Sequence, residues 1–245
     1  MHDTSTIPLA PPADSLAIPP LRHGERLTRD EFERRYAAMP HVNKAELING
    51  VVYMPSPVRS RQHGRPHNHL GTWLGNYEAA TLGVESNSNA TVRLDLGSEP
   101  QPDLMLFIDP ARGGQARLSA DDYVENGPEL AAEIAASSVA LDLGERLLAY
   151  QRNQVREYIV WRVLDRQIDW FVLRNGRYEP LAPDAEGVFR SEVFPGLWLN
   201  AAALLRGDLA AVLACVQQGM TTPEHAAFVE RLAAIRQGSA ATQET

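Results

Sequence analysis

The sequence predicts an α/β (α+β) fold, a mixed β-sheet flanked by helices, with a helical extension at its C-terminal end. Residues 104–108 are a continuous apolar run of the length of a buried strand, and residues 130–135 are a second short apolar run with one acid inside it. Asn49-Gly50 and Asn175-Gly176 are dipeptides typical of hairpin turns. Residues 66–82 carry apolar side chains at helical spacing. Strands and helical segments therefore alternate along the chain, which is the pattern of a sheet covered by helices.

The N-terminal part is expected to start with a disordered, proline-rich lead, residues 1–24, without the basic and apolar regions of a signal peptide. Thr28 can cap a helix that runs through Tyr36, because the acidic residues of its first turn suit the positive end of the helix dipole. The apolar segments 45–48 and 51–54 flank the Asn-Gly turn. They predict the first β-hairpin.

The middle of the chain is expected to supply a long helix and the centre of the sheet. The amphipathic segment 66–82 predicts the helix, and Gly83 can end it. Residues 91–96 alternate as in a half-buried strand, and the run 104–108 predicts a fully buried one. Residues 109–128 carry glycine, proline and charge, so an irregular segment is expected there.

The C-terminal half predicts the remaining elements. Strands are expected at 130–135, 157–163 and 168–173, a helix at 141–153, and a core-closing segment at 194–199. Two helices, 201–213 and 222–237, are expected beyond it, the second with Thr222 as its cap and Gly238 after its end. The chain is thus divided into the lead, one core domain at 25–200 and a helical extension at 201–245.

Composition narrows the class of protein. Apolar residues make up 44% of the 245 residues, and no apolar run approaches the roughly 18 residues that a membrane-spanning helix needs. Cys215 is the only cysteine, so one chain can form neither a disulfide nor a cysteine-based zinc site. We therefore expect a cytoplasmic protein that does not associate with membranes.

The charge distribution is uneven. A net charge of -8 argues against a protein that coats nucleic acid by charge alone. Residues 47–77, however, contain no Asp or Glu and carry Arg59, Arg61, Arg65 and His63. They could form a basic rim for a phosphodiester substrate, or simply a solvated loop. Lys44 is the only lysine beside 22 arginines, which suggests a general drift from lysine to arginine.

Two acidic residues stand where acids are normally avoided. Asp103 precedes one buried apolar run, and Glu133 lies within another. A buried carboxylate is costly unless it is paired, protonated or bound to a metal ion. Mg²⁺ prefers a few carboxylates together with water and substrate phosphate, so the pair predicts a metal site for phosphodiester hydrolysis. Alternatively, Asp103 is a turn residue after Pro102, and Glu133 pairs with a nearby arginine.

A set of short motifs, in this order, resembles one known family. They are Glu46-Leu47-Ile48-Asn49-Gly50, Met54-Pro55-Ser56-Pro57, His63, Gln101-Pro102-Asp103, Pro128-Glu129-Leu130-Ala131-Ala132-Glu133, Asp142 with Arg146 and Tyr150, and Glu157-Tyr158. The chain resembles the Uma-two family of restriction-endonuclease-like proteins, which belongs to the PD-(D/E)XK nuclease superfamily. The match covers about residues 28–200 and implies that the core domain is a nuclease domain.

The resemblance also implies site residues. Asp103 resembles the Asp of the family's Pro-Asp motif, and Glu133 resembles its (D/E) position; these two would be the metal-binding residues. Glu46 resembles an additional acid that completes the pocket, and His63 resembles the histidine after the Ser-Pro loop. Substrate would be bound by His63 and by the basic residues Arg59, Arg61 and Arg65.

The sequence departs from the superfamily pattern at the lysine. Ala135 stands two residues after Glu133, where the pattern has lysine, and the family lysine of the following helix is Arg146 here. Arginine keeps the charge and can clamp a phosphate, but it does not release a proton near neutral pH. Arg146 is therefore expected to act in catalysis. An open alternative is that it forms an ordinary surface pair with Asp142 or Glu145.

The combined prediction is a Mg²⁺- or Mn²⁺-dependent endonuclease that acts on DNA. The competing prediction is a non-catalytic binding or regulatory module that retains the nuclease scaffold, because of Arg146 and the acidic net charge. A nucleotide-binding enzyme is disfavoured, since no glycine-rich phosphate loop of the G-x-x-x-x-G-K type occurs.

His67 and His69 are interpreted as a helix-start cluster. A homodimer is expected because apolar residues mark the last two helices; they are Leu205, Val212, Leu213, Phe228, Leu232 and Ile235.

Overall fold

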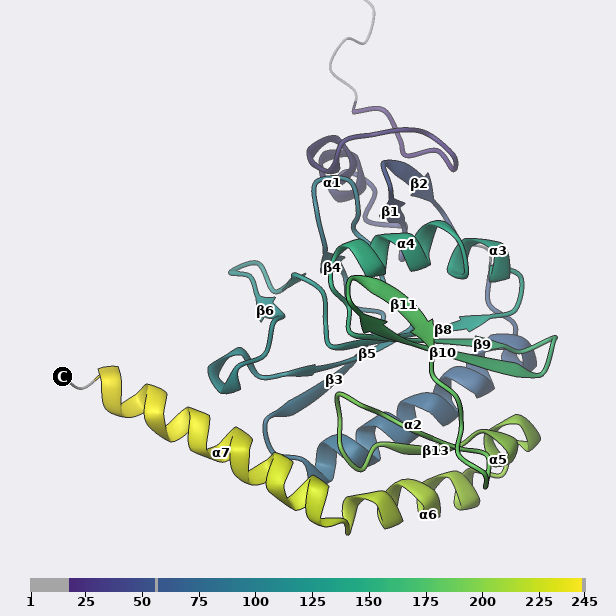
Figure 1. Cartoon of the computed structure of the whole chain (residues 1–245). Coiled ribbons are helices and arrows are strands. Elements are labelled where there is room, and N and C mark those ends of the chain that lie inside the picture. The colour runs from purple at the N-terminus through teal and green to yellow at the C-terminus, as the bar shows by residue number, and fades with distance from the viewer. Residues whose placement is uncertain (1–17, 56, 244–245) are drawn as a thin grey trace, which may run out of the picture.

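The computed structural model describes residues 18–55 and 57–243 and is built around one six-stranded sheet (Figure 1). The strand order is β11-β10-β9-β8-β5-β3. Its strands are β3 (Val84–Ser88), β5 (Leu104–Ile108), β8 (Leu130–Ala135), β9 (Glu157–Arg162), β10 (Gln167–Arg174) and β11 (Arg177–Pro180). The β8–β9 pair is parallel and the other pairs are antiparallel. The sheet is therefore mixed, which confirms the predicted fold class.

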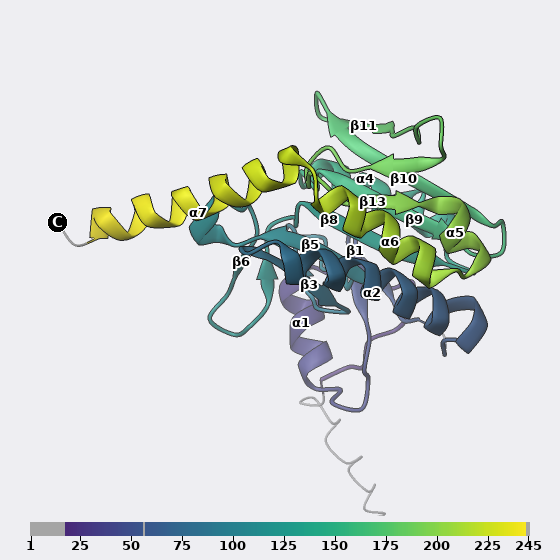
Figure 2. The same cartoon turned by 90° about the horizontal axis from the view of Figure 1, so that it is seen from below.

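The two apolar runs form the centre of this sheet. All residues of β5 and β8 are buried, because helices cover one face of the sheet and helices together with residues of β4 and β7 cover the other. Helix α2 (Arg65–Ala80) lies on one face with α5 (Ala201–Arg206) and α6 (Leu209–Met220), whereas α3 (Val139–Asp142) and α4 (Glu145–Arg152) lie on the other (Figure 1). Figure 2, which views the molecule from below, shows α2 and α6 running alongside each other in front of the sheet. Buried apolar side chains fill both spaces between helices and sheet.

A smaller N-terminal layer stands beyond α4. It consists of helix α1 (Arg29–Ala37), capped by the Thr28 side chain as predicted, and the hairpin of β1 (Glu46–Ile48) and β2 (Val51–Tyr53). Asn49 and Gly50 have φ values of 51° and 76°, the left-handed conformation that a type I′ turn requires. The predicted lead falls largely on residues 1–17, outside the described residues. Of its described end, residues 18–24, only Leu21 is buried, in the core cluster that contains Phe32, and the other residues are exposed.

The strand predicted over 91–96 is mostly wrong. Only β4 (Val92–Arg93) forms there, and it belongs to a separate three-stranded sheet with β7 (Val124–Glu125) and β6 (Arg117–Leu118). The reason is that residues 95–98 fold back as a turn, with Leu96 exposed. The segment expected to be irregular between 109 and 128 thus contributes two short strands and the 3₁₀ turn Pro110–Arg112.

Two predicted helices are interrupted by glycines. The segment 141–153 is divided between α3 and α4 at Gly144, whose φ and ψ are -115° and -107°, and a Cβ there would lie 2.6 Å from the Ala140 carbonyl oxygen. Gly207, with φ of 77°, ends α5, and the Asp208 side chain caps α6. The last helix, α7 (Pro223–Gln243), continues past the predicted end at 237. Gly238 therefore stands within the helix, where glycine costs stability but does not forbid it.

The C-terminal helices complete the lower core. A two-stranded ladder of β12 (Val188–Arg190) and β13 (Trp198–Asn200) leads into α5. Val212, Phe228 and Leu232 are buried against the rest of the chain, so they do not offer the dimer surface for which they were considered. The π-helical turn Ser60–Gly64 leads into α2. Among the described residues, no helix is long and apolar enough to cross a membrane.

Candidate active site

Acidic side chains gather where the central strands meet the N-terminal hairpin. Asp103 directly precedes β5, and Glu133 lies in β8. The antiparallel register pairs Leu104 with Ala132, which sets Asp103 beside Glu133 on the neighbouring strand. Both residues are only 4% exposed. The sequence-based expectation that two carboxylates on adjacent strands share one site thus has a direct structural basis.

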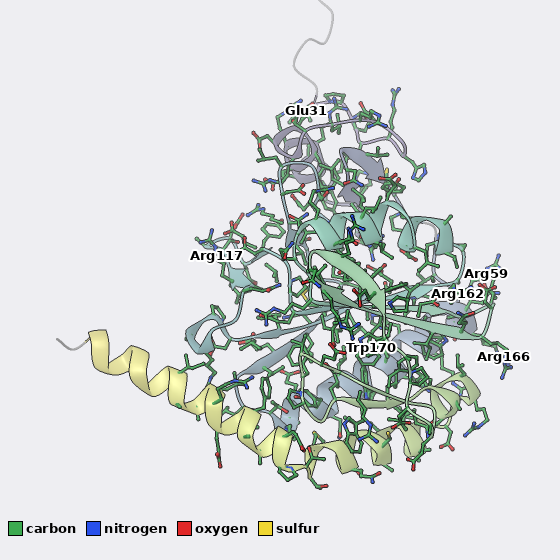
Figure 3. All side chains as sticks on the ribbon, viewed as in Figure 1. Glu31, Arg59, Arg117, Arg162, Arg166 and Trp170 are labelled. Atoms are coloured by element: carbon green, nitrogen blue, oxygen red, sulfur yellow. The ribbon has the colours of Figure 1, made fainter. Side chains whose placement is uncertain are left out.

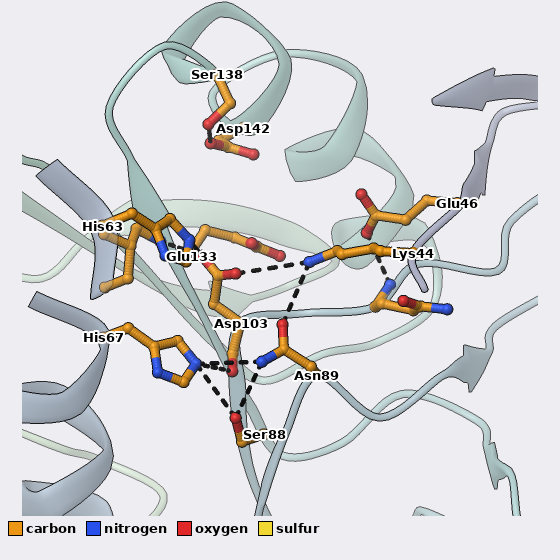
Figure 4. Close-up of polar contacts among 12 residues, drawn as sticks. Lys44, Glu46, His63, His67, Ser88, Asn89, Asp103, Glu133, Ser138 and Asp142 are labelled. Atoms are coloured by element: carbon orange, nitrogen blue, oxygen red, sulfur yellow. Dashed lines mark hydrogen bonds and ion pairs between the residues drawn. The ribbon is translucent and has the colours of Figure 1, made fainter. Parts of the chain in front are cut away.

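Asp103 is held by two donors on one of its oxygens. Its Oδ2 accepts hydrogen bonds from the Ile134 backbone N–H at 2.8 Å and from His63 Nε2 at 3.1 Å (Figure 4). Burial alone would raise the pKa of Asp103, but the His63 hydrogen bond and the charge of Lys44 lower it to about 2. The ionised carboxylate keeps Oδ1 available, because this oxygen accepts no hydrogen bond from the described residues and only faces Lys44 Nζ at 3.6 Å.

Arg146 lies inside the acidic cluster and not on the surface. Its Nη1 donates to Glu133 Oε1 at 2.8 Å and to Glu46 Oε1 at 2.9 Å, and its Nη2 donates to Glu46 Oε2 at 3.0 Å. Its Nε faces Asp142 Oδ1 at 3.0 Å. The side chain is 5% exposed, so the alternative of an ordinary surface pair is wrong for Arg146. Glu145, the other residue considered for that pair, bonds instead to Asn49.

The remaining contacts show which carboxylate oxygens of the cluster accept hydrogen bonds and which do not. Both oxygens of Glu46 accept hydrogen bonds from Arg146, and Oε1 also accepts the Gln101 backbone N–H at 2.7 Å. Glu133 Oε1 accepts the Tyr150 hydroxyl at 3.0 Å, whereas Glu133 Oε2 accepts no hydrogen bond from the described residues. Asp142 is bound by the Ser138 hydroxyl at 2.6 Å. Glu46 therefore orients Arg146, and its role as the additional acid that completes the pocket stays a prediction.

The pKa shifts follow this division. Burial would raise the pKa of Glu46, but the charges of Arg146 and Lys44 lower it below its ordinary value. Burial raises the pKa of Glu133 well above its ordinary value, and the charges of Asp103 and Asp142 add to the effect while Arg146 opposes it. Glu133 is thus the carboxylate whose charge is least compensated by the chain itself.

Lys44 is a site residue that sequence reasoning missed. Its Nζ lies 3.6 Å from Asp103 Oδ1 and 3.4 Å from Asn89 Oδ1, and its side chain reaches between Glu46 and Asp103 (Figure 4). Burial would lower the pKa of Lys44, but the charges of Glu46, Asp103 and Glu133 raise it. A signal was present, because residues two apart in an extended segment point to the same face, and Lys44 stands two residues before Glu46.

His67 is a second site residue that sequence reasoning set aside. Its Nε2 lies 2.9 Å from the Asp103 backbone oxygen and 3.2 Å from Ser88 Oγ. The rings of His63 and His67 stack with centroids 5.7 Å apart, since residues four apart share one face of a helical turn. An open surface pocket of about 330 Å³ lies beside His67, lined mainly by uncharged polar side chains of α2 and β3. His69 instead faces Arg65, at 3.4 Å.

The predicted basic rim lies outside the acidic cluster. Arg59, Arg61 and Arg65 are exposed and flank the turn that carries His63. Figure 3 shows Arg59 at the outer edge of the molecule, on the same side as Arg166. No ion pair involves these three arginines within the described part of the chain. Within the described residues, the guanidinium groups of Arg59 and Arg61 make no hydrogen bond, whereas Arg65 Nε donates to His69 Nε2 at 3.4 Å. Exposed cations are what a rim for phosphate groups would require.

The residues present fit a divalent cation. Among the described residues, the cluster holds four carboxylates and two permanent cations, Lys44 and Arg146. Two negative charges are therefore uncompensated when every carboxylate is ionised. The available oxygens are Asp103 Oδ1 and Glu133 Oε2, which suits Mg²⁺ because it takes few protein carboxylates and keeps several waters. No group of three or more acidic, histidine or cysteine side chains forms a cage within the described residues.

The fold of this chain is found in a solved structure. Among solved structures, the chain is similar to a protein from Anabaena variabilis described as a "putative nuclease belonging to DUF820". The TM-score is 0.56 at 12% sequence identity, over 74% of this chain and 98% of the other. At that identity the likeness establishes the fold alone. A comparison with curated proteins gave no match.

The family follows from the sequence comparison. The Uma2 family model, described as "Putative restriction endonuclease", matches residues 29–202. The match spans most of the chain, from helix α1 to the start of α5. The protein therefore belongs to the Uma2 family, and the resemblance inferred from the short motifs is confirmed.

Proposed function

We propose that this protein is an endonuclease that hydrolyses DNA phosphodiester bonds with a divalent metal ion, Mg²⁺ or Mn²⁺. The observation that carries the proposal is the charge imbalance of the buried cluster, in which four carboxylates face two cations. Uncompensated buried charge is costly, and one divalent ion would remove it. Family membership supports a nucleic-acid substrate.

Asp103 and Glu133 are the proposed metal-binding residues. Each presents one carboxylate oxygen without a hydrogen bond from the described residues, while the other oxygen is fixed by neighbouring donors. A bound metal ion would supply Lewis-acid polarisation of the phosphoryl group and an acidified water. The chain itself orients both carboxylates, since His63 and the Ile134 N–H hold Asp103, and Arg146 with Tyr150 holds Glu133.

Substrate binding is assigned to the basic residues beside the cluster. Arg59, Arg61 and Arg65 are exposed around His63, and contacts from such residues to backbone phosphates supply sequence-independent affinity. The net charge of -8 makes this rim necessary, because the rest of the molecule repels a polyanion. Binding should therefore weaken steeply as the salt concentration rises.

One contact favours the competing function of a non-catalytic binding module. The Arg146 guanidinium already bonds to Glu133 Oε1, so part of the charge that a metal ion would neutralise is neutralised by the chain. On this alternative the nuclease scaffold persists, the cluster is structural, and the basic rim alone contacts nucleic acid. Cleavage and metal binding separate the two proposals.

The test combines cleavage with metal titration. Supercoiled and single-stranded DNA are incubated with Mg²⁺ or Mn²⁺ and wild type, Asp103→Asn or Glu133→Gln, and Mn²⁺ affinity is measured by calorimetry. We expect cleavage by wild type and none by Asp103→Asn or Glu133→Gln, and loss of Mn²⁺ binding in both of these variants with the fold retained. Asp165→Asn is the matched control, because it removes an exposed carboxylate from the β9–β10 turn. Equal Mn²⁺ affinity in all four proteins would contradict the metal site.

A further inference from the structure

The acidic cluster holds two cations, Arg146 and Lys44, which differ in how accessible their charged groups are to a substrate. Arg146 directs its guanidinium nitrogens at Glu46, Glu133 and Asp142, and its side chain is 5% exposed. The Lys44 side chain is 23% exposed. A buried guanidinium that is surrounded by carboxylates has no room for a further anion. The cation on the open side of the cluster is Lys44.

The donor inventory of Lys44 supports this distinction. An ammonium group has three N–H donors. Within the described residues, Lys44 makes one hydrogen bond, to Asn89 Oδ1 at 3.4 Å. The 3.6 Å separation from Asp103 Oδ1 is an ion pair but is too long for a hydrogen bond. Two N–H donors therefore remain beside the available oxygen of a proposed metal-binding carboxylate.

We infer that Lys44 is the catalytic cation of this nuclease, contacting the scissile phosphate, and that Arg146 is a positioning residue that fixes Glu133. The inference rests on the proposed function. The sequence pattern indicates a different catalytic cation, one supplied by the segment after Glu133. The structure brings Lys44 to the cluster from the other side, from the extended segment that leads into β1.

The chemistry needs only charge and donors from Lys44. In hydrolysis, a water oxygen forms a bond to phosphorus and the bond between phosphorus and the leaving sugar oxygen breaks. The proton of the attacking water passes to solvent, and the leaving oxygen takes one up. Lys44 stays protonated throughout, donating to a non-bridging phosphate oxygen as negative charge develops on it. Asn89 fixes the direction of the ammonium group, since its Oδ1 accepts a hydrogen bond from one of the three N–H donors.

The sequence allows a selective test, because Lys44 is the only lysine and Cys215 is the only cysteine. Single-turnover cleavage of a labelled duplex at saturating Mn²⁺ is compared among wild type, Lys44→Met and Lys44→Arg. In a Cys215→Ala background, Lys44→Cys is alkylated with bromoethylamine, which restores an amino group at nearly the same reach, or with iodoacetamide, which gives a neutral group. Arg117→Met is the control for loss of one exposed cation, since Arg117 lies on β6, outside the cluster.

Lys44→Met should lower the cleavage rate constant on the order of a hundredfold, by analogy with removal of one preorganised donor to a transition-state oxygen. Its Mn²⁺ affinity should not fall, because Lys44 is a cation and not a ligand. Aminoethylation should restore cleavage, and the neutral adduct should not. A merely structural Lys44 would instead change the thermal midpoint and leave the rate constant of the folded protein unaltered.

The possible failures are distinguishable. If Lys44→Met cleaves like wild type, or if the aminoethyl and neutral adducts are equally active, the inference about Lys44 is wrong while the proposed nuclease stands. If wild type neither cleaves DNA nor binds Mn²⁺, the proposed function and the inference both fall. Where Lys44→Met does not fold, the alkylated Lys44→Cys pair gives the answer, because the chemical group is added to the folded protein.

Discussion

Replacing Arg146 with methionine tests whether the buried cation holds the acidic cluster together. Methionine keeps much of the side-chain volume and removes the guanidinium, so Glu46, Glu133 and Asp142 lose their common partner. Removing one member of a buried ion pair costs about 3–5 kcal/mol, because the partners are left as uncompensated buried charges. An exposed pair would cost at most about 1 kcal/mol. The Arg146 side chain is 5% exposed, so the larger cost, that of breaking a buried ion pair, applies to it.

The loss should depend on pH in a defined direction. The Arg146 charge lowers the pKa values of Glu46, Glu133 and Asp142 in the folded chain. In Arg146→Met the folded-state pKa of Glu46 rises, and the pKa values of Glu133 and Asp142, which burial already holds above their ordinary values, rise further, so the folded variant binds protons more tightly than the folded wild type. The unfolded chains of the two proteins bind protons alike, so the variant's deficit is smallest at low pH, where these carboxyls are protonated in both folded proteins, and it grows as the pH rises toward 8.

The assay is urea unfolding at pH 4, 6 and 8, supported by thermal unfolding. For a chain of this size, 3–5 kcal/mol corresponds to a fall in the thermal midpoint of about 6 to 20 °C. Arg152→Met is the matched control, because Arg152 lies on the same helix, α4, in a pair with Asp95 and is 52% exposed. A deficit at pH 8 no larger than that of Arg152→Met, or one that shrinks as the pH rises, would refute the buried-network reasoning.

Two further predictions concern other parts of the molecule. Burial raises the pKa of Glu157 to about 7, although Ser191 and two backbone N–H groups bond to it. Because the folded pKa lies above the unfolded value near 4.5, Glu157 lowers stability by roughly 3 kcal/mol as the pH rises from about 4.5 to 7, and urea titrations of Glu157→Gln should lack that slope. A homodimer remains a prediction, since cutting both strands often requires two copies of a site. Light scattering that gives 27.0 kDa at micromolar concentration would exclude it.

Periodicity predicted the elements that are buried on both faces, and it failed for elements whose side chains are polar. Strand β5 is a continuous apolar run and β8 is apolar except for Glu133, and the structure has both strands at the predicted bounds. Strand β3 was not predicted, because Val84 is its only apolar residue and the rest is polar. It forms the edge of the sheet, where a strand has one neighbour and polar side chains meet solvent. Its pairing with β5 is a tertiary event that the local sequence does not encode.

The site could be predicted from sequence only where a residue conflicts with its own surroundings. Asp103 and Glu133 were found because a carboxylate in an apolar run demands a partner. Lys44 and His67 cause no such conflict locally, since a lysine before a strand and a histidine at a helix start are ordinary surface residues. Their contacts with Asp103 depend on how β1 and α2 approach β5, which is set by the packing of the whole domain. The presence of only one lysine did not point to Lys44 either, because it was attributed to a general drift from lysine to arginine.

The chemistry of the two cations explains why one chain would use both. A guanidinium is planar and can bond to a carboxylate with two parallel donors, as Arg146 does with Glu46, and such a fixed arrangement suits a permanent partner. An ammonium on a flexible stem accepts partners from several directions, which suits a group that meets a substrate and then releases it. The arginine that follows Glu133 in the sequence therefore need not indicate a disabled nuclease. It stabilises the acid that binds metal in our proposal, and the only lysine in the chain remains on the open side of the cluster to contact the phosphate.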